Sequence, residues 1–460
     1  SQPSRVIVAG ILHILPPPPT PTTSRFCRMP CPGSRAAAAD RQPRQVNTGR
    51  GEEPKAVEKK VAVQAPRKPE EQWKIPPRYQ VREVLGKGSY GKVCEAYDSA
   101  EKRHVAIKKI ANLFGERCDC KRILREIAIM SRLDHKNIVQ IYDIPPPSDL
   151  LRFNELYIVM EVCDTDLKKL FREKVNLTPA HVDTLFYNLL LGLNYLHKAG
   201  VYHRDLTPGN CLVNQDLTVK ICDFGLSRAV GAEVREEGAV GRKHSDNIER
   251  HLTAHVVTRW YRAPELILLQ DDYTEAIDIW SAGCIYAELL GMLEGVRMSE
   301  RGPLFPGRTC FPMSPDPEHE SDYKFHTRGN DQLNVVFMLL GTPSEADIEK
   351  QHRADARKYL RRFEKHSGSS LKARLPHAPD ESCDLLARML RFNADERIPL
   401  AQAFSHKLFS VLEARDVRKE TVAPALVNLA FEGEKDLGEA RLRGYLCEEM
   451  RKFHPEVPKI

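Results

Sequence analysis

The sequence predicts an α+β fold of two lobes, a small β-rich lobe followed by a large, mainly helical one. Residues 92–98 alternate as a strand does, and residues 105–108 and 156–163 are short apolar runs within the expected small lobe at 79–163. In the expected large lobe at 164–408, residues 179–200 show the Pro start and Gly stop of a helix. Glycine-rich and carboxylate-bearing motifs follow one another through both regions. With 460 residues, the chain is long enough for such a unit and for extensions at both ends.

Composition narrows the class of protein. A hydrophobic content of 42% and a charged content of 29% are ordinary for a globular chain. The net charge of +6 is modest, because 69 Lys and Arg residues are nearly balanced by 63 Asp and Glu residues. We therefore expect neither nucleic acid nor membrane partners. The 12 cysteines lack paired metal-ligand spacing and are interpreted as reduced thiols, which favours the cytoplasm or nucleus.

Residues 1–73 differ from the rest of the chain. A proline run at 16–19, an alanine run at 36–39 and the lack of any acidic residue before Asp40 predict a disordered extension. The apolar stretch 6–15 is too short to cross a bilayer.

The small lobe opens with a glycine-rich segment, GKGSYG, at residues 86–91. Glycine lets backbone N–H groups approach phosphates closely, but the pattern alone fits a structural turn equally well. A dinucleotide-binding fold would need a helix next. Residues 92–98 instead alternate as a strand does, which predicts a β-hairpin over the phosphates.

Two charged residues follow on a strand and a helix. Lys108 ends the strand-like run VAIK, and Glu126 lies in residues 121–130, where Ile123, Leu124 and Met130 mark one apolar helix face. Either residue alone would fit an exposed surface charge. Together they can form a buried pair, whose disruption typically costs about 3–5 kcal/mol.

The large lobe opens with the segment HRDLTPGN at residues 203–210, followed by DFG at 223–225. Asp205 can accept the proton of an attacking hydroxyl. Asn210 and Asp223 offer the oxygen ligands that Mg²⁺ prefers. This set predicts phosphoryl transfer.

Further motifs complete the pattern: APE at 263–265, DIWSAG at 278–283, and Arg397 where a partner for Glu265 is expected. In this order the motifs resemble the protein-kinase superfamily over about residues 79–408. The resemblance implies ATP and Mg²⁺ as cofactors, with Asn210 and Asp223 as metal ligands. It implies catalytic roles for Lys108, Glu126, Asp205, Thr207, Asn210 and Asp223. It implies ATP contacts from Leu85, Gly86, Gly88, Gly91, Val93, Ala106, Lys108, Met160, Glu161, Cys163, Asp166 and Leu212.

The sequence VVTRWYRAPE at residues 256–265 resembles the activation lip of mitogen-activated protein kinases. That family carries Thr-x-Tyr before it, whereas this chain carries Thr253-Ala254-His255, similar to an atypical apicomplexan branch. The resemblance implies that a phosphate on Thr253 is gathered by Arg125, Arg204 and Arg228, whereas Arg259 and Arg262 match a phosphotyrosine pocket that His255 cannot fill. We therefore expect activation by phosphorylation at Thr253 alone, although an unmodified loop threonine remains the alternative.

The resemblance also implies an organisation and partners. It implies an activation segment at 223–265, a family insert at about 344–378, and a C-terminal extension at 409–460 that packs back on the small lobe. Expected partners are proteins with Ser/Thr-Pro sites, together with an upstream kinase unless the chain phosphorylates itself. We expect a monomer.

Thr207 departs from the superfamily, which usually carries Lys at this position. Loss of one charge-assisted hydrogen bond costs about 1.5–3 kcal/mol, or about ten- to more than a hundredfold in rate. We expect a working but slow enzyme. The alternative is a pseudokinase that binds nucleotide and acts as a signalling scaffold.

Overall fold

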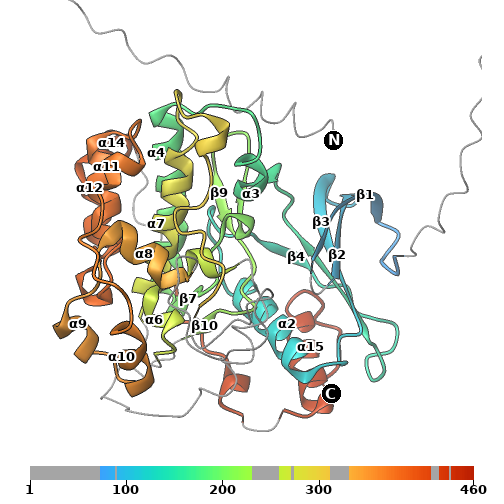
Figure 1. Ribbon diagram of the computed structural model, residues 1–460. Helices are drawn as coiled ribbons and strands as arrows, with labels where there is room; N and C mark the ends of the chain where they lie inside the picture. The colour runs from blue at the N-terminus through green and yellow to red at the C-terminus, as the bar shows by residue number, and fades with distance from the viewer. Residues whose placement is uncertain are drawn as a thin grey trace, which may run out of the picture. The chain divides into compact units, whose positions relative to one another are not determined.

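A computed structural model describes residues 73–88, 91–229, 258–270, 274–310, 331–415, 424–434 and 437–459. The described residues from Ile75 onward belong to one compact unit. It consists of an antiparallel sheet with a helix beside it, joined to a mainly helical body (Figure 1). The two-lobed α+β fold predicted from the sequence is confirmed.

The small lobe contains a five-stranded sheet in the order β1-β2-β3-β5-β4. All four strand pairs are antiparallel. The strands are β1 (Tyr79–Gly88), β2 (Gly91–Asp98), β3 (Arg103–Ala111), β4 (Ile141–Asp143) and β5 (Glu155–Met160). Lys108 lies in the middle of this sheet, opposite Val93 on one side and Ile158 on the other. Its neighbours therefore fix the position of its backbone.

Helix α2 (Arg117–Met130) is the long helix of the small lobe. Its apolar residues Ile123, Leu124 and Met130 are all buried, as predicted from their spacing. Glu126 is buried among them, which an isolated carboxylate would not tolerate without a partner.

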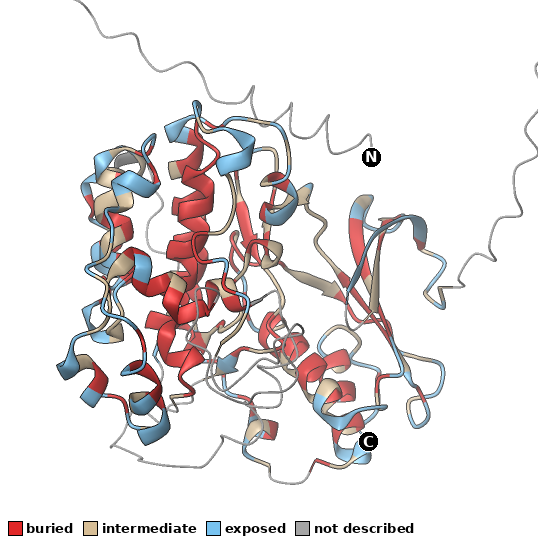
Figure 2. Cartoon of the chain, in the orientation of Figure 1, coloured by how far each residue is buried: buried red, intermediate tan, exposed pale blue. Residues whose placement is uncertain are grey.

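Two helices form the centre of the large lobe (Figure 2). Helix α4 (Pro179–Lys198) begins after Thr178, whose hydroxyl accepts the His181 N–H, and Pro179 fills the first turn. It ends before Gly200, which has a φ of +72°. Every residue of α7 (Ala276–Leu290) is buried, so this helix is a rigid support for the loops above it.

Shorter elements complete the large lobe. The strands are β6 (Thr165–Asp166), β7 (Val201–Tyr202), β8 (Cys211–Val213), β9 (Val219–Ile221) and β10 (Arg228–Ala229), paired as β6-β8-β9 and β7-β10. The helices are α3 (Leu167–Leu170), α6 (Pro264–Ile267), α8 (Gln332–Leu340), α9 (Glu345–Glu349), α10 (Ala354–Leu360), α11 (Leu371–Arg374), α12 (Asp380–Met389), α13 (Leu400–Phe404) and α14 (Ser410–Arg415).

The last helix, α15 (Glu439–Arg451), lies beside α2 although more than 300 residues separate them (Figure 1). Arg443 donates to the carbonyl oxygen of Phe153 at 2.6 Å, and His454 bonds to the Asp143 carboxylate at 2.6 Å. Earlier in the same segment, the N–H of Val427 bonds to the carbonyl oxygen of Ala199 at the end of α4. The C-terminal residues thus contact both lobes.

A buried ion pair joins two distant parts of the large lobe. Arg397 donates to both carboxylate oxygens of Glu265, at 2.5 and 2.7 Å, and also to the carbonyl oxygen of Ala276. This is the pairing expected from the sequence motif. The two bonds fix α6 against the start of α7.

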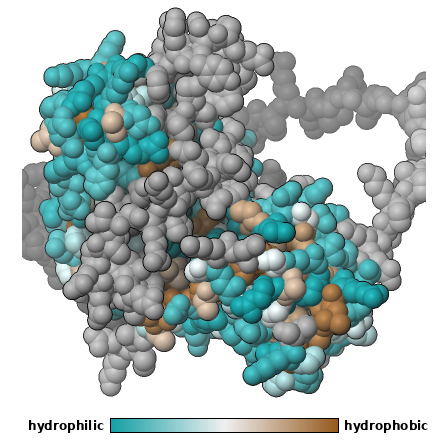
Figure 3. All heavy atoms as spheres, turned by 90° about the horizontal axis from the view of Figure 1, so that it is seen from below, coloured by the Kyte–Doolittle hydropathy of each residue, from teal (hydrophilic) through white to brown (hydrophobic). Residues whose placement is uncertain are grey.

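The face shown in Figure 3 is largely hydrophilic where the structure describes it, with a few separate hydrophobic patches. Exposed apolar residues scattered in this way are normal for a protein surface. Within the described residues, no helix has both the length and the apolar character needed to span a membrane.

Replacing Arg397 by Ala should lower the free energy of unfolding by about 3–5 kcal/mol, because the Glu265 carboxylate would stay buried without its cation. Urea denaturation measures this change. The matched control is Arg361→Ala, which removes exposed pairs to Glu345 and Glu349 and should leave the unfolding midpoint unchanged. Equal losses in the two variants would contradict the assignment.

Candidate active site

The first component of the site is the ion pair between Lys108 of β3 and Glu126 of α2. The Lys108 ammonium lies 2.6 and 2.8 Å from the two oxygens of the Glu126 carboxylate. Burial alone would lower the pKa of Lys108, but the charges of Glu126 and Asp223 outweigh it and raise that pKa. Lys108 therefore stays charged, and its pair with Glu126 connects β3 to α2.

The second component is the loop at residues 203–210, which a buried carboxylate holds in place. Asp278, in the first turn of α7, accepts the backbone N–H groups of His203 and Arg204, each at 2.8 Å. The ring of His197 donates a third hydrogen bond to it at 3.0 Å. Burial alone would raise the pKa of Asp278, but these hydrogen bonds lower it, so the carboxylate remains charged.

Two residues of the site have left-handed backbone conformations. Arg204 has a φ of +66° and Asp223 a φ of +65°. Such values are uncommon for residues other than glycine and cost of the order of 1–3 kcal/mol each. The bonds from Asp278 to the 203–210 loop offset this cost for Arg204.

The loop at residues 222–227 is bonded directly to the 203–210 loop. The N–H of Cys222 donates to the carbonyl oxygen of Asn210, and the ring of His203 donates to the carbonyl oxygen of Cys222, both at 3.0 Å. The Asn210 side chain donates to the backbone carbonyl of Asp205 at 2.9 Å. These bonds hold the loop that contains Asp205 and Asn210 against the loop that contains Asp223.

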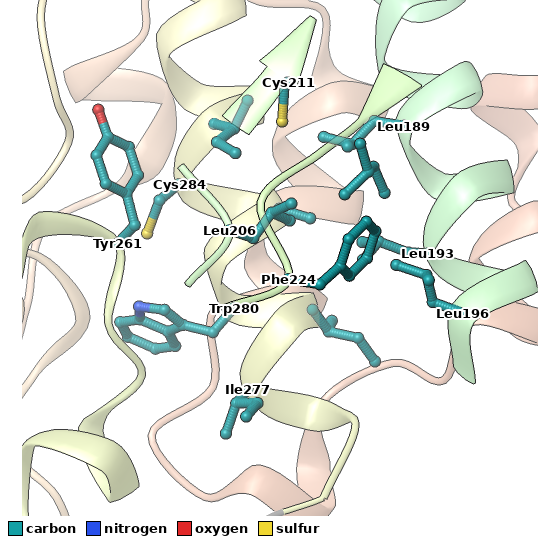
Figure 4. Close-up of a cluster of buried hydrophobic side chains, with 14 of the residues drawn as sticks. Leu189, Leu193, Leu196, Leu206, Cys211, Phe224, Tyr261, Ile277, Trp280 and Cys284 are labelled. Atoms are coloured by element: carbon teal, nitrogen blue, oxygen red, sulfur yellow. The ribbon is translucent and has the colours of Figure 1, made fainter. Parts of the chain in front are cut away.

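Apolar packing supports both loops from below. Leu206 and Phe224 are completely buried. Figure 4 shows Phe224 pointing toward Leu193 and Leu196 of α4, with Leu206 in the same cluster. Each loop therefore has an apolar anchor next to its functional carboxylate.

Asp205 has an unusual electrostatic environment. Burial, followed by the negative charge of Asp223, raises its pKa to about 7. The positive charges of Arg262 and Arg122 oppose this increase. A carboxyl group with this pKa is suited to accept a proton near neutral pH.

The predicted ATP contacts of the small lobe lie on neighbouring strands of one sheet. Leu85 and Gly86 lie on β1, Gly91 and Val93 on β2, Ala106 on β3 and Met160 at the end of β5. Gly88 ends β1, and residues 89 and 90 at the tip lie outside the described part. At Gly91, a Cβ atom would come within 1.9 Å of the Lys109 carbonyl oxygen, so only glycine fits there.

The connection between the lobes contains the remaining predicted contacts. The N–H of Glu161 bonds to the carbonyl oxygen of Gln140, so its own carbonyl is the backbone group left for a ligand. Burial raises the pKa of the half-buried Cys163 thiol to about 12, so this thiol stays protonated. Asp166 accepts the Lys169 N–H at the start of α3 and pairs with Leu212 across β6 and β8.

The five predicted regulatory arginines fall into two groups. Arg125 on α2, Arg204 in the 203–210 loop and Arg228 on β10 lie near the start of the activation segment. Arg259 lies in the 3₁₀ helix Thr258–Tyr261 and Arg262 directly follows it, and both are buried. Thr253 and His255 lie outside the described residues.

The donor chemistry fits the predicted magnesium site. The Asn210 amide nitrogen donates to the backbone of Asp205, so its side-chain oxygen remains for a cation. The Asp223 carboxylate follows Cys222, whose N–H is bonded to the backbone carbonyl of Asn210. Two protein oxygens completed by substrate phosphates suit Mg²⁺, which rarely binds in an all-protein cage.

The fold and the site define a protein kinase. Residues 79–301 match the family described as Protein kinase domain. Rice mitogen-activated protein kinase 1 (Oryza sativa subsp. japonica) is 38% identical over 372 residues, covering 81% of each chain. Mitogen-activated protein kinase 6 of Arabidopsis thaliana is 38% identical over 81% of this chain and 82% of its own length. Mitogen-activated protein kinase MPS1 of Pyricularia oryzae is 37% identical over 83% and 81%.

The chain belongs to the mitogen-activated protein kinase family and is a Ser/Thr protein kinase. Members of this family use ATP and typically Mg²⁺. They act on protein substrates and are regulated by upstream kinases.

Sequence reasoning missed two residues that contact elements of the site. The first is Asp278, which was recognised as part of a motif but not as the anchor of the 203–210 loop. A carboxylate at the start of an otherwise apolar helix was the available signal. The second is Glu432, which lies 2.5 Å from Arg125. No local pattern pointed to it, because 307 positions separate the two residues.

In the metal-free protein, the Asp205 carboxyl should titrate with a pKa of about 7. Below that pH the carboxyl is protonated and cannot accept a proton, so the fraction of the free protein with a competent base should fall as the pH falls. Carbon NMR titration measures the pKa directly. Asp223→Asn removes a negative charge and should lower the pKa of Asp205. A pKa near the usual value of about 3.9 in both proteins would contradict this account.

Proposed function

We propose that this chain transfers the γ-phosphoryl group of ATP to Ser and Thr hydroxyls of proteins, with a preference for sites followed by Pro. The observation that carries the proposal is the convergence of the Lys108–Glu126 pair with Asp205, Asn210 and Asp223. A proline-directed choice rests on the resemblance of residues 256–265 to the family, with Arg259 in the wall of that pocket.

In this mechanism, each residue has one task. Gly86, Gly88 and Gly91 would cover the phosphates, and Lys108 would bind the α- and β-phosphates. Asp205 would orient the acceptor hydroxyl and receive its proton. Asn210 and Asp223 would hold Mg²⁺, which neutralises charge that develops on the phosphates.

The adenosine part of ATP would occupy the space between the lobes. Leu85, Val93 and Ala106 would cover the adenine from above, and Leu212 would close the pocket from below. Backbone groups of Glu161 and Cys163 would bond to the base beside Met160, with Asp166 near the ribose. The ten described cysteines are free thiols, which suits a protein of the cytoplasm or nucleus.

We further propose that the chain belongs to an atypical apicomplexan-like branch activated at one site. A phosphate adds about −1.5 to −2 charge and three acceptor oxygens, which Arg125, Arg204 and Arg228 would gather. His255 replaces the Tyr that would carry the second phosphate. The activating phosphate would come from an upstream kinase or from the chain itself.

Replacing Asp205 by Asn should abolish phosphate transfer, with a loss of about a thousandfold or more, and spare ATP binding. Transfer to a generic basic protein and nucleotide affinity are the two measurements. The control is Asp355→Asn, an exposed aspartate at the start of α10, which should retain full activity. Activity that survives in Asp205→Asn would refute the proposed role.

Replacing Thr207 by Lys should raise kcat by about tenfold to a hundredfold, because it restores a cation next to the transferred phosphate. Steady-state kinetics on the same substrate measure the change. If kcat is unchanged in the variant, Thr207 does not limit the turnover of the wild-type enzyme. If wild type and variant both bind ATP and neither transfers phosphate, the chain is the nucleotide-binding scaffold of the alternative interpretation.

Replacing Thr253 by Ala should lower the activity of the activated kinase by about tenfold. Ser245→Ala, in the same segment, is the matched control and should change nothing. Phosphosite mapping by mass spectrometry should find Thr253 modified in the active protein. An active preparation with unmodified Thr253 would contradict single-site activation.

A further inference from the structure

A carboxylate from the C-terminal part of the chain forms ion pairs with two basic side chains of helix α2. Glu432 lies in the 3₁₀ helix Ala430–Gly433. One carboxylate oxygen is 2.5 Å from Arg125 Nε and the other is 3.1 Å from Lys121 Nζ. The next residue back, Phe431, is buried, and its ring lies 5.5 Å from the Tyr445 ring of α15. The carboxylate is thus held at a fixed position.

The contact is a charged one. Burial alone would raise the pKa of Glu432, but Arg125 and Lys121 lower it, so the group is ionised at neutral pH. Its side chain is 31% exposed, whereas that of Arg125 is 17% exposed. An ion pair that is partly withdrawn from water, with short charge-assisted bonds, is stronger than an exposed surface pair.

Arg125 connects this carboxylate to the catalytic machinery in two ways. It is the residue directly before Glu126, on the same helix. Its Nη1 atom also donates to the carbonyl oxygen of Gly225 at 2.7 Å. Glu432, Arg125 and Gly225 therefore form a chain of bonds from the C-terminal segment to the loop that contains Asp223.

A second carboxylate of the same C-terminal part contacts the residues directly after the last turn of α2. Glu449 on α15 accepts the Ser131 hydroxyl at 2.7 Å and the Arg132 guanidinium at 2.9 Å. Two acidic residues of the C-terminal part thus hold α2, Glu432 at the middle of the helix and Glu449 directly after its last residue. In this arrangement the Lys108–Glu126 pair is formed.

We propose that Glu432 is a positioning residue for catalysis: it holds Lys121 and Arg125 of α2 so that Glu126 stays paired with Lys108 before any phosphate is present on the activation segment. The inference rests on the proposed function, in which Arg125 later receives the Thr253 phosphate. Before that phosphate arrives, Arg125 is already paired with the Glu432 carboxylate. Glu432 thus gives the unphosphorylated kinase basal activity.

The test uses the full chain after phosphatase treatment. Glu432→Gln removes the charge and keeps the shape, and Glu432→Asp restores the charge on a shorter side chain. The control is Glu434→Gln, two positions away, because the Glu434 carboxylate bonds to Arg441 and Tyr445 of α15 rather than to α2. For each protein, kcat, the KM for ATP and the melting temperature are measured.

We expect Glu432→Gln to lower kcat/KM for ATP about tenfold, within the range of typical coupling between sites. Glu432→Asp should recover most of the loss, and Glu434→Gln should match wild type. Glu432→Gln with full activity would overturn the inference, as would equal losses of activity and melting temperature in both Gln variants. A wild-type chain that transfers no phosphate even when Thr253 is phosphorylated would instead refute the proposed function.

Discussion

The site depends on one buried carboxylate, Asp278. It is fully buried at the start of α7, and it satisfies two consecutive backbone N–H groups of the 203–210 loop. Without it, two donors would be orphaned in the interior, and the left-handed conformation of Arg204 would lose its support. Because the helix beneath is fully buried, the loop holds the Asp205 backbone at a fixed position.

Charge organises the residues around this anchor. Lys108 is paired with Glu126 and also experiences the field of Asp223, and Asp205 experiences both Asp223 and Arg262. Each carboxylate therefore changes the proton affinity of its neighbours. In such a site, a cation that arrives beside Asp223 alters Asp205 as well, so nucleotide loading and base strength are coupled.

Local spacing in the sequence was enough to predict the strands of the small lobe and the buried face of α2. The Arg397–Glu265 pair, whose members lie 132 positions apart, was predicted only from the resemblance to kinases. The role of Asp278 and the contact of Glu432 with Arg125 could not be predicted in this way, since both need elements that lie far apart in the chain. The pKa of Asp205 depends on burial and on the sum of several charges, which no motif encodes.

The C-terminal segment forms a second connection between the two lobes, through hydrogen bonds to each of them. The first runs through residues 160–166, and the other passes from the contact of Val427 with Ala199 to that of Arg443 with Phe153. Two crossing points define a line. Rotation about that line stretches neither connection, whereas translation of one lobe past the other would strain both. Opening of the cleft should therefore be a hinge rotation of one lobe about this line rather than a shear of one lobe past the other.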